Sequence, residues 1–342
     1  MKHMTIKDVA AKTGVSVSTV SRVLNNAKDV NEKTRTKILQ TIAEFNYKPN
    51  PAAKALVNQN NRYIAVLIPN LNHSVISRQV RGIMVEAQKK NIDVLIFDYD
   101  NDVHLEIRQL ELLSDKMLDG AIVITSVAPE HKLLELAKKM PLVLMECKVT
   151  GLEIDQIELD DAFGMKILIE YLRGKGHERI GMLTGELGTY SADVRSSHFK
   201  SIMQVLEVKY PYEEYIIDCP WSLLGGFNAL QELLRKKPDV TAVIGATDQI
   251  AIGALGAAYQ MGIKIPEQLS IVGYDNFEEG EVSAPQLTTL SYPAERSGEL
   301  AAKYLLERIK NPKGVRQRRI LPLYLLERRS VARPRREKDL KI

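Results

Sequence analysis

The strongest local pattern in the chain is TIKDVAAKTGVSVSTVSRVLN, at residues 5–25. Apolar residues recur three and four positions apart within each half of this stretch, which predicts two short helices with one buried face each. Gly14 can adopt the left-handed backbone conformation that a tight turn between helices requires. Ser16 is a favourable N-cap for the second helix. The stretch therefore predicts a helix-turn-helix.

Charge distinguishes the two classes of protein in which this pattern occurs, small helical bundles and DNA-binding domains. Residues 1–62 contain eleven Lys and Arg against four Asp and Glu, a net charge of +7. The whole chain is +4, so residues 63–342 sum to −3. Neutralising DNA phosphates requires positive charge gathered in this way. The sequence therefore favours double-stranded DNA as the first partner.

A family resemblance extends beyond the helix-turn-helix, through VNEKTR at 30–35 and IAEFNYKPN at 42–50. Together these segments resemble the DNA-binding head of the lactose-repressor (LacI/GalR) family of bacterial transcription regulators. Asn31 can cap a third helix whose apolar positions close a small core. The resemblance implies a homodimer on a near-palindromic operator, with one head on each half-site.

The second helix of the pattern carries the predicted DNA contacts. Arg22 and Ser18 are expected to read base edges, with Val17 against a thymine methyl group. The residues expected to hold phosphates are Thr5, Thr19, Ser21 and Asn25.

The segment 49–62 is predicted to be a linker that contains a hinge helix. Asn50 is a possible cap, but the helix is too short to be stable alone, because isolated helices need roughly 12–15 residues. The resemblance implies that it folds when two subunits meet on DNA. Leu56 would then enter the minor groove as an apolar wedge, with Ala53 and Lys54 beside it. The alternative is a plain solvated linker.

The remainder of the chain alternates strand-like and helix-like runs, which predicts parallel sheets wrapped by helices. Because about 280 residues is long for one such sheet, we expect two α/β lobes with a cleft between the carboxyl ends of their strands. The strand candidates are 64–68, 94–97, 121–124, 142–145, 180–183, 216–217, 242–244 and 270–272. The helix candidates lie near 75–90, 104–113, 132–139, 163–173, 196–207, 223–235, 249–260 and 295–308.

The expected organisation is a head (1–48), a linker (49–62), an effector-binding and dimerisation body (63–330) and a basic tail (331–342). One lobe of the body comprises 63–161 and 291–322, and the other comprises 162–290 and 323–330. The tail is expected to be solvated and mobile. It has no leucine heptads, so a dimer is favoured over a tetramer.

Motifs in the body resemble the periplasmic-binding-protein-like part of the same family. They are RGI at 81–83, LDG at 118–120, GHERI at 176–180, TDQIAIG at 247–253, SIVGYDN at 270–276 and LTT at 287–289. The resemblance implies that Arg195, Asp248 and Asp275 hold a small effector, often a sugar or a purine. Carboxylates can accept hydrogen bonds from two hydroxyls, and a guanidinium donates a planar fork. The other effector candidates are Asn70, Asn72, Val75, Glu146, Asp161, Trp221 and Thr247.

Several positions depart from the family pattern. HSVI at 73–76 replaces the usual Asn-Pro-Phe-Phe, so the aromatic ring expected to stack on the effector is absent. Thr247 stands where an Asn is common, Cys147 where a basic residue is expected and His198 where a glycine is expected. The missing ring argues against a planar base as the ligand. Trp221 can form an apolar wall for a sugar or belong to the core, and both interpretations stay open.

Other classes of protein find little support in the sequence. It has no N-terminal apolar segment and no run approaching ~18 apolar residues, so a cytoplasmic protein without a membrane segment is expected. Two distant cysteines and six unclustered histidines predict neither a disulfide nor a metal site. Without a Walker loop, dinucleotide fingerprint or nucleophile elbow, we expect no cofactor and no enzymatic activity.

The leading hypothesis is a sequence-specific, ligand-gated repressor of a metabolic operon, with carbohydrate metabolism favoured. An alternative keeps this architecture but replaces the small molecule with a partner protein as the signal. A distant alternative is a solute-binding receptor, which would require export.

Overall fold

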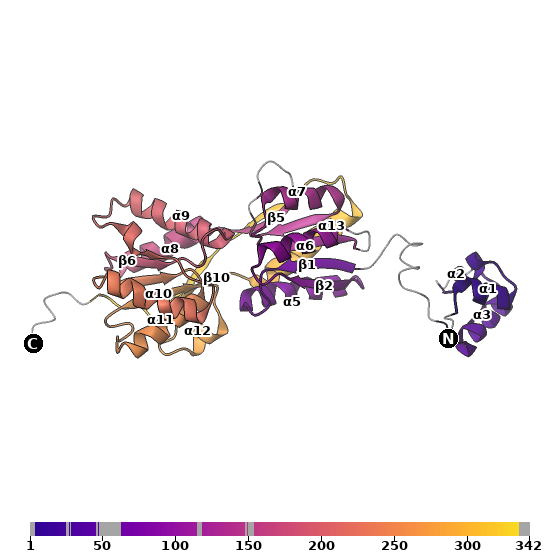
Figure 1. Ribbon diagram of the computed structural model, residues 1–342, viewed down its shortest axis with the longest axis horizontal. Coiled ribbons are helices and arrows are strands. Elements are labelled where there is room, and N and C mark those ends of the chain that lie inside the picture. The colour runs from indigo at the N-terminus through magenta and orange to yellow at the C-terminus, as the bar shows by residue number, and fades with distance from the viewer. Residues whose placement is uncertain are drawn as a thin grey trace, which may run out of the picture. The chain divides into compact units, whose positions relative to one another are not determined.

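The computed structural model describes residues 4–24, 27, 29–45, 47, 63–114, 118–147, 149 and 154–334. The chain divides into two compact units, Met1–Asn61 and Arg62–Ile342, which we call the head and the body (Figure 1). The predicted linker 49–62 lies outside the described residues.

The described part of the head contains the predicted helices, α1 (Ile6–Thr13), α2 (Val17–Leu24) and α3 (Glu32–Glu44). Gly14 ends α1 with a φ of 72°, the left-handed conformation expected of it. The hydroxyl of Ser16 accepts a hydrogen bond from the backbone N–H of Thr19 at 3.2 Å, as an N-cap of α2 does. The helices close over a small core, whose buried members are Val9, Ala10, Val20, Val23 and Ile38.

The body contains two sheets, each in its own lobe (Figure 1). The lobe 1 sheet is wholly parallel and runs in the order β11 (Arg318–Leu321), β5 (Asp155–Leu159), β4 (Leu142–Met145), β3 (Gly120–Ile124), β1 (Tyr63–Ile68) and β2 (Asp93–Asp98). The lobe 2 sheet runs in the order β12 (Tyr324–Leu326), β10 (Thr288–Ser291), β9 (Ser270–Tyr274), β8 (Ala242–Gly245), β6 (Ile180–Leu183) and β7 (Ile216–Ile217). Its strands are parallel except for the antiparallel pairing of β10 with β12.

Helices cover both sheets, as the alternating pattern predicts. Lobe 1 carries α5 (Ser74–Gln88), α6 (Val103–Leu113), α7 (Glu130–Lys139) and α13 (Ala294–Lys310) (Figure 1). Lobe 2 carries α8 (Asp161–Gly174), α9 (Tyr190–Val205), α10 (Leu223–Lys236), α11 (Asp248–Gln260), α12 (Glu278–Val282) and the short 3₁₀ helix η1 (Tyr212–Tyr215). No helix among the described residues is both long enough and apolar enough to span a bilayer.

Four strands of the structure are not predicted from the sequence, namely β5, β10, β11 and β12. β5, β10 and β11 are more polar than a buried strand normally is, and β12 has only three residues. Partners distant in the chain satisfy the polar groups. Asp155 of β5 is buried and accepts hydrogen bonds from Arg308 Nε at 2.7 Å and Arg308 Nη2 at 3.0 Å. Such a partner, distant in sequence, cannot be seen in a local pattern.

The beginning of the predicted solvated tail differs from the expectation. The backbone N–H of Ala332 donates to Ser270 Oγ at 3.1 Å, and the carbonyl of Ala332 pairs with His177 Nε2 at 2.9 Å. Residues 331–334 are therefore held against lobe 2, because Ser270 and His177 offer buried polar partners. Residues 335–342 lie outside the described part of the chain.

Candidate functional site

The outer surface of α2 carries the predicted DNA-contacting residues that the structure describes. The side chains of Ser18 and Arg22 are exposed, and that of Val17 is 40% exposed. The side chain of Val17 is therefore accessible from the solvent. Thr19 and Ser21 lie on the same helix and are partly buried, and Thr5 is the exposed N-cap of α1. Asn25, Asn50, Ala53, Lys54 and Leu56 lie outside the described residues.

Several of these polar groups already have partners within the head. The hydroxyl of Thr5 donates to Asp8 Oδ2 at 2.7 Å, and that of Thr19 bonds Ser16 Oγ at 2.9 Å. The guanidinium of Arg22 forms an ion pair with Asp29, which is also exposed. The predicted contact of Arg22 with a base edge would require the arginine to give up this pair.

A cavity of about 320 Å³ lies where the strands of both lobes end. This is the position at which open α/β sheets bind ligands, because polar loops and helix N-termini converge there. Eight of the ten predicted effector residues line it, namely Asn70, Asn72, Val75, Glu146, Arg195, Trp221, Thr247 and Asp275. The sequence left two interpretations of Trp221 open, a wall of the ligand site or a part of the core. Trp221 lines the cavity and also packs against the core.

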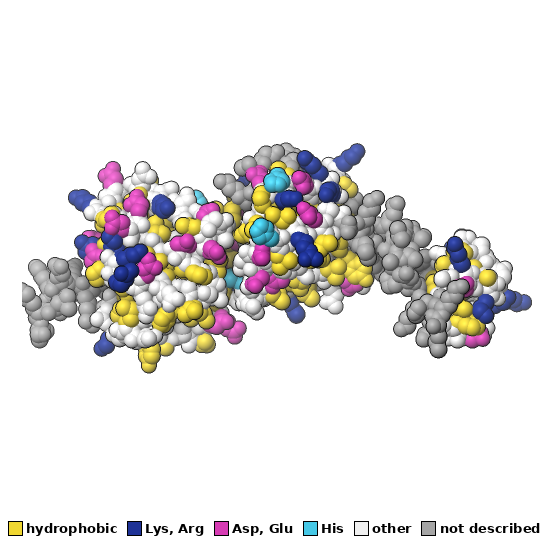
Figure 2. Space-filling model, viewed as in Figure 1, with side chains coloured by type: hydrophobic (Ala, Val, Ile, Leu, Met, Phe, Trp, Pro, Cys, Tyr) yellow, Lys and Arg dark blue, Asp and Glu magenta, His cyan; other side chains and the backbone are white. Residues whose placement is uncertain are grey.

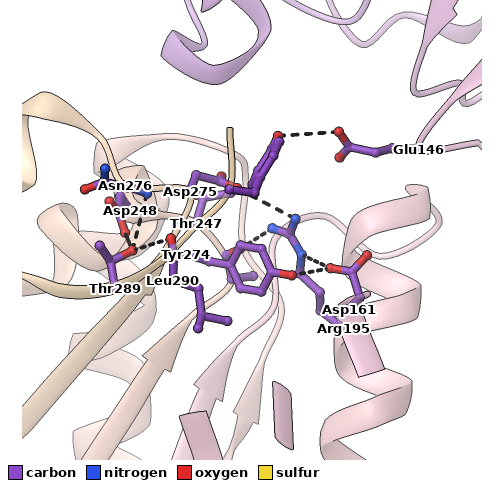
Figure 3. A network of polar contacts seen from close by, with 12 residues as sticks. Glu146, Asp161, Arg195, Thr247, Asp248, Tyr274, Asp275, Asn276, Thr289 and Leu290 are labelled. Atoms are coloured by element: carbon purple, nitrogen blue, oxygen red, sulfur yellow. Dashed lines mark hydrogen bonds and ion pairs between the residues drawn. The ribbon is translucent and has the colours of Figure 1, made fainter. Parts of the chain in front are cut away.

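Arg195 of α9 is the centre of a buried polar network (Figure 3). Its Nε donates to Asp161 Oδ1 at 3.0 Å, and its Nη1 donates to the carbonyl of Ala246 at 2.6 Å. Its Nη2 lies 3.8 Å from Asp275 Oδ1, and its guanidinium lies 3.6 Å from the centre of the Tyr274 ring. Burial opposes the charge of Arg195, but Tyr274, Asp161 and Asp275 together raise its pKa, so it stays a cation.

Asp161 and Asp248, the other two predicted effector residues, are not among the residues that line the cavity. Asp161 accepts from the Tyr274 hydroxyl at 2.6 Å as well as from Arg195, so it orients the arginine. Asp248 accepts from Thr289 Oγ1 at 2.5 Å and from the backbone N–H of Phe277 at 2.7 Å. Both carboxylates are buried behind the cavity because these neighbours supply the donors that a buried carboxylate needs.

Three carboxyl groups in or behind the cavity have raised pKa values, and burial is the main cause for Glu146. Burial raises the pKa of Asp248 to about 7, against the opposing hydrogen bonds from Thr289 and Phe277. Burial also raises the pKa of Asp275 well above its usual range, although Arg195 opposes this shift.

The structure adds cavity residues that the sequence analysis missed. Tyr99 follows β2, and its buried hydroxyl has no hydrogen-bond partner among the described residues. His73, at the N-cap of α5, has an unpartnered Nδ1, and burial followed by the charges of Arg195 and Arg78 lowers its pKa to about 4. Tyr190 and Tyr292 also line the cavity. The rule that polar groups follow strands would have found Tyr99, whereas Tyr292 follows β10, a strand without a sequence signal.

The described residues contain no cluster of three or more His, Cys, Asp or Glu side chains that could hold a metal ion. The lining of the cavity offers hydrogen-bonding groups, the guanidinium of Arg195 and the carboxyl groups of Glu146 and Asp275.

Two family models match this chain. Residues 5–50 match the bacterial regulatory proteins of the lacI family, and residues 169–331 match the periplasmic binding protein-like domain. The transcriptional repressor PurR of Proteus mirabilis is 33% identical over 332 residues, which cover 96% of this chain and 97% of the relative. The ribose operon repressor of Haemophilus influenzae is 32% identical over 308 residues, which cover 90% of this chain and 92% of the relative.

Solved structures show the same architecture. The Lac repressor dimer bound to operator and the anti-inducer ONPF has a TM-score of 0.82 at 26% identity, covering 97% of this chain and all of that one (100%). A LacI-family regulator of Enterococcus faecalis with bound ribose has a TM-score of 0.71 at 28% identity, covering 80% of this chain and 100% of that one. With relatives above 30% identity over nine-tenths of its length, this chain belongs to the lacI family of bacterial regulatory proteins.

Proposed function

We propose that this protein is a dimeric repressor of a metabolic operon and that a small sugar in the cavity sets its affinity for operator DNA. The cavity at the ends of both sheets carries this proposal, because it joins a ligand site to both lobes. The protein acts in the cytoplasm, where its operator DNA lies.

A small molecule accounts for the cavity better than a partner protein does. Buried polar atoms without partners are rare in folded proteins, because each costs roughly 1–3 kcal/mol. The Tyr99 hydroxyl and His73 Nδ1 are two such atoms, and both residues line the cavity. A ligand that enters the cavity can satisfy them, whereas a protein docked on the outer surface cannot.

The mixture of donors and acceptors favours a sugar. Arg195, Tyr99 and Tyr190 can donate, while Glu146 and Asp275 can accept, so hydroxyls on several carbons find partners. Trp221 supplies an apolar ring for a sugar face. Ribose is our first candidate, since one relative is named a ribose operon repressor and the Enterococcus faecalis structure holds ribose.

The ligand would act by changing how the two lobes meet. It touches side chains from both sheets, so it stabilises one angle between the lobes over others. In a dimer this angle sets the spacing of the two linkers that lead to the heads. A coupling of about 1–3 kcal/mol is typical of such systems.

We place the dimer contact along the outer edge of β2, where Leu95 projects to one side of the sheet and Ile96 to the other, and where Met84 of α5 is also exposed. We call this edge the β2 face. The three side chains are 42%, 39% and 45% exposed, and β2 is an edge strand of the lobe 1 sheet. Figure 2 shows hydrophobic side chains gathered over this part of the body. A second copy of the chain would cover them, as expected for an exposed apolar patch.

Selection of fragments from the host's genomic DNA tests the function directly. We expect the full-length protein to enrich near-palindromic sites that lie beside metabolic genes. Its affinity for a selected site, followed by fluorescence anisotropy, should change 5- to 150-fold when ribose or another sugar saturates the cavity. Equal binding to selected and shuffled DNA would exclude operator recognition. A selected site whose affinity responds to a cell-extract protein, and to no sugar, would favour the partner-protein alternative.

A further inference from the structure

A side chain of lobe 1 reaches directly to the segment of lobe 2 that carries a ligand group. Arg78, on α5, donates through Nη2 to the backbone carbonyl of Asp275 at 2.9 Å and to that of Asn276 at 3.3 Å. The side chain of Asp275 lines the cavity. One residue therefore offers its carboxylate to the ligand and its carbonyl to the other lobe.

The segment 275–277 has an unusual backbone. Asp275 has a φ of 103° and Asn276 a φ of 55°, both in the positive region that residues other than glycine seldom adopt. Such a conformation is unfavourable for a residue with a side chain and persists only where its surroundings hold it. The segment should therefore relax when one of its supports is removed.

Lobe 2 supplies three short hydrogen bonds to this segment, in addition to a longer one from the backbone N–H of Asn276 to Thr289 Oγ1 at 3.4 Å. The backbone N–H of Asp275 donates to the carbonyl of Leu290 at 2.9 Å, and that of Phe277 donates to Asp248 at 2.7 Å. Arg328 donates to the side chain of Asn276 at 2.7 Å. None of the three involves lobe 1.

Lobe 1 adds further support, from the N-cap and the N-terminal part of α5. In addition to the two bonds from Arg78, the ring of His73 meets the ring of Phe277 edge-on, with centroids 5.0 Å apart. Arg78 and His73 both lie at the end of α5 that faces the cavity, and His73 lines the cavity. The contact therefore closes the two lobes at the edge of the ligand site.

We propose that Arg78 is a positioning residue that latches the lobes together, holding Asp275 toward the ligand and linking occupancy of the cavity to the angle between the lobes. This inference rests on the proposed function only for its regulatory consequence. The latch itself requires neither an operator nor an identified ligand.

The latch is tested in the full-length protein by acrylamide quenching of Trp221, the single tryptophan of the sequence, which lines the cavity. We expect Arg78→Ala to raise the quenching constant at least twofold, because the cavity opens when the lobes part. Hydrogen exchange of the Asp275 and Phe277 amides should accelerate tenfold or more. Arg78→Lys keeps one donor and should restore part of both effects. Arg108→Ala, which removes an exposed arginine from α6 of the same lobe, should match the wild type.

The regulatory consequence is tested with the selected operator. We expect Arg78→Ala to change the operator Kd 5- to 150-fold in the absence of sugar, while Arg108→Ala leaves it unchanged. Wild-type quenching and exchange in Arg78→Ala would overturn the latch. Faster quenching and exchange in Arg78→Ala together with an unchanged operator Kd would overturn the regulatory role of the latch. If the alanine variant fails to fold, Arg78→Met, which keeps the aliphatic stem and removes every donor, takes its place, and wild-type values in that variant would contradict the proposal. A chain that selects no DNA site refutes the proposed function, and the quenching result still tests the latch.

Discussion

At the residue scale, two buried arginines show how the same chemistry serves different purposes. Arg195 binds Asp161 and the carbonyl of Ala246 at the edge of the cavity. Arg308 binds Asp155 and the carbonyls of Gly314 and Val315, at 2.7 and 2.8 Å, within lobe 1. Both use the planar fork of the guanidinium, which a lysine cannot reproduce.

We predict that Arg195→Lys and Arg308→Lys both lower the free energy of unfolding, by about 3–5 kcal/mol, because each leaves a buried carboxylate poorly paired. Only Arg195→Lys should abolish the change in Trp221 fluorescence on addition of a cavity ligand such as ribose. Urea unfolding and a fluorescence titration of both variants check this. If the Trp221 fluorescence of Arg195→Lys still changes when the ligand is added, Arg195 has a structural role alone.

The raised pKa of Asp248 leads to a second prediction at this scale, on how stability depends on pH. Its pKa in the folded protein is about 7, above the ordinary 3.8, so the folded state keeps a proton that the unfolded chain releases. Stability should therefore fall as the pH rises from about 4 to 8. Asp248→Asn should reduce this slope, and its stability relative to the wild type should improve toward pH 8. At 1.36 kcal/mol per pKa unit, the upper limit of the effect is roughly 4 kcal/mol.

Thermal unfolding from pH 4 to pH 8 measures this slope. Glu170→Gln, which removes a 62% exposed carboxylate from α8, is the matched control and should leave the slope unchanged. Parallel curves for Asp248→Asn and the wild type would contradict the prediction.

At the element scale, helix pairs in both lobes approach closely through glycines. In lobe 1, a Cβ on Gly82 of α5 would strike the carbonyl of Glu295, and one on Gly298 of α13 would strike the carbonyl of Gln79. In lobe 2, Gly226 of α10 and Gly253 of α11 meet backbone atoms in the same way. Backbone atoms cannot move aside as a flexible side chain does, so these positions fix the distance between the helices.

We predict that Gly82→Ala lowers stability by about 1–3 kcal/mol despite the better helix propensity of alanine, because α5 and α13 must separate. Gly256→Ala on α11 is the matched control. Its added Cβ would meet Phe227 at an ordinary 3.7 Å, so a gain of up to about 1 kcal/mol is expected. Urea unfolding compares the two, and equal effects would exclude close packing as the cause.

At the scale of the whole molecule, operator affinity depends on two heads binding together. Two linked sites can raise overall affinity by a factor of about 10²–10⁴ over one site. The β2 face is where we place the contact that links them.

We predict that Leu95→Glu converts the dimer to a monomer and reduces operator affinity by about 10²–10⁴-fold, since a charge on each copy would be buried against the other. Val315→Glu introduces the same charge at a 91% exposed loop position and should have neither effect. Sedimentation velocity and anisotropy measure both variants. A Leu95→Glu protein that stays dimeric would place the interface elsewhere.

The sequence by itself determined the helix-turn-helix, the two-lobed parallel architecture and Arg195 with Asp275 at the cavity. The helix-turn-helix and the two-lobed architecture follow from periodicity and from turn residues such as Gly14. The two cavity residues follow from the resemblance of the chain to a known family. Only the tertiary structure decided that Asp161 and Asp248 support the site from behind it and that Tyr99 and His73 line it. It alone showed that Arg78 crosses from one lobe to the other. The reason is that these roles depend on partners up to 198 positions away in the chain, and no local pattern records which distant carbonyl or hydroxyl a side chain will meet.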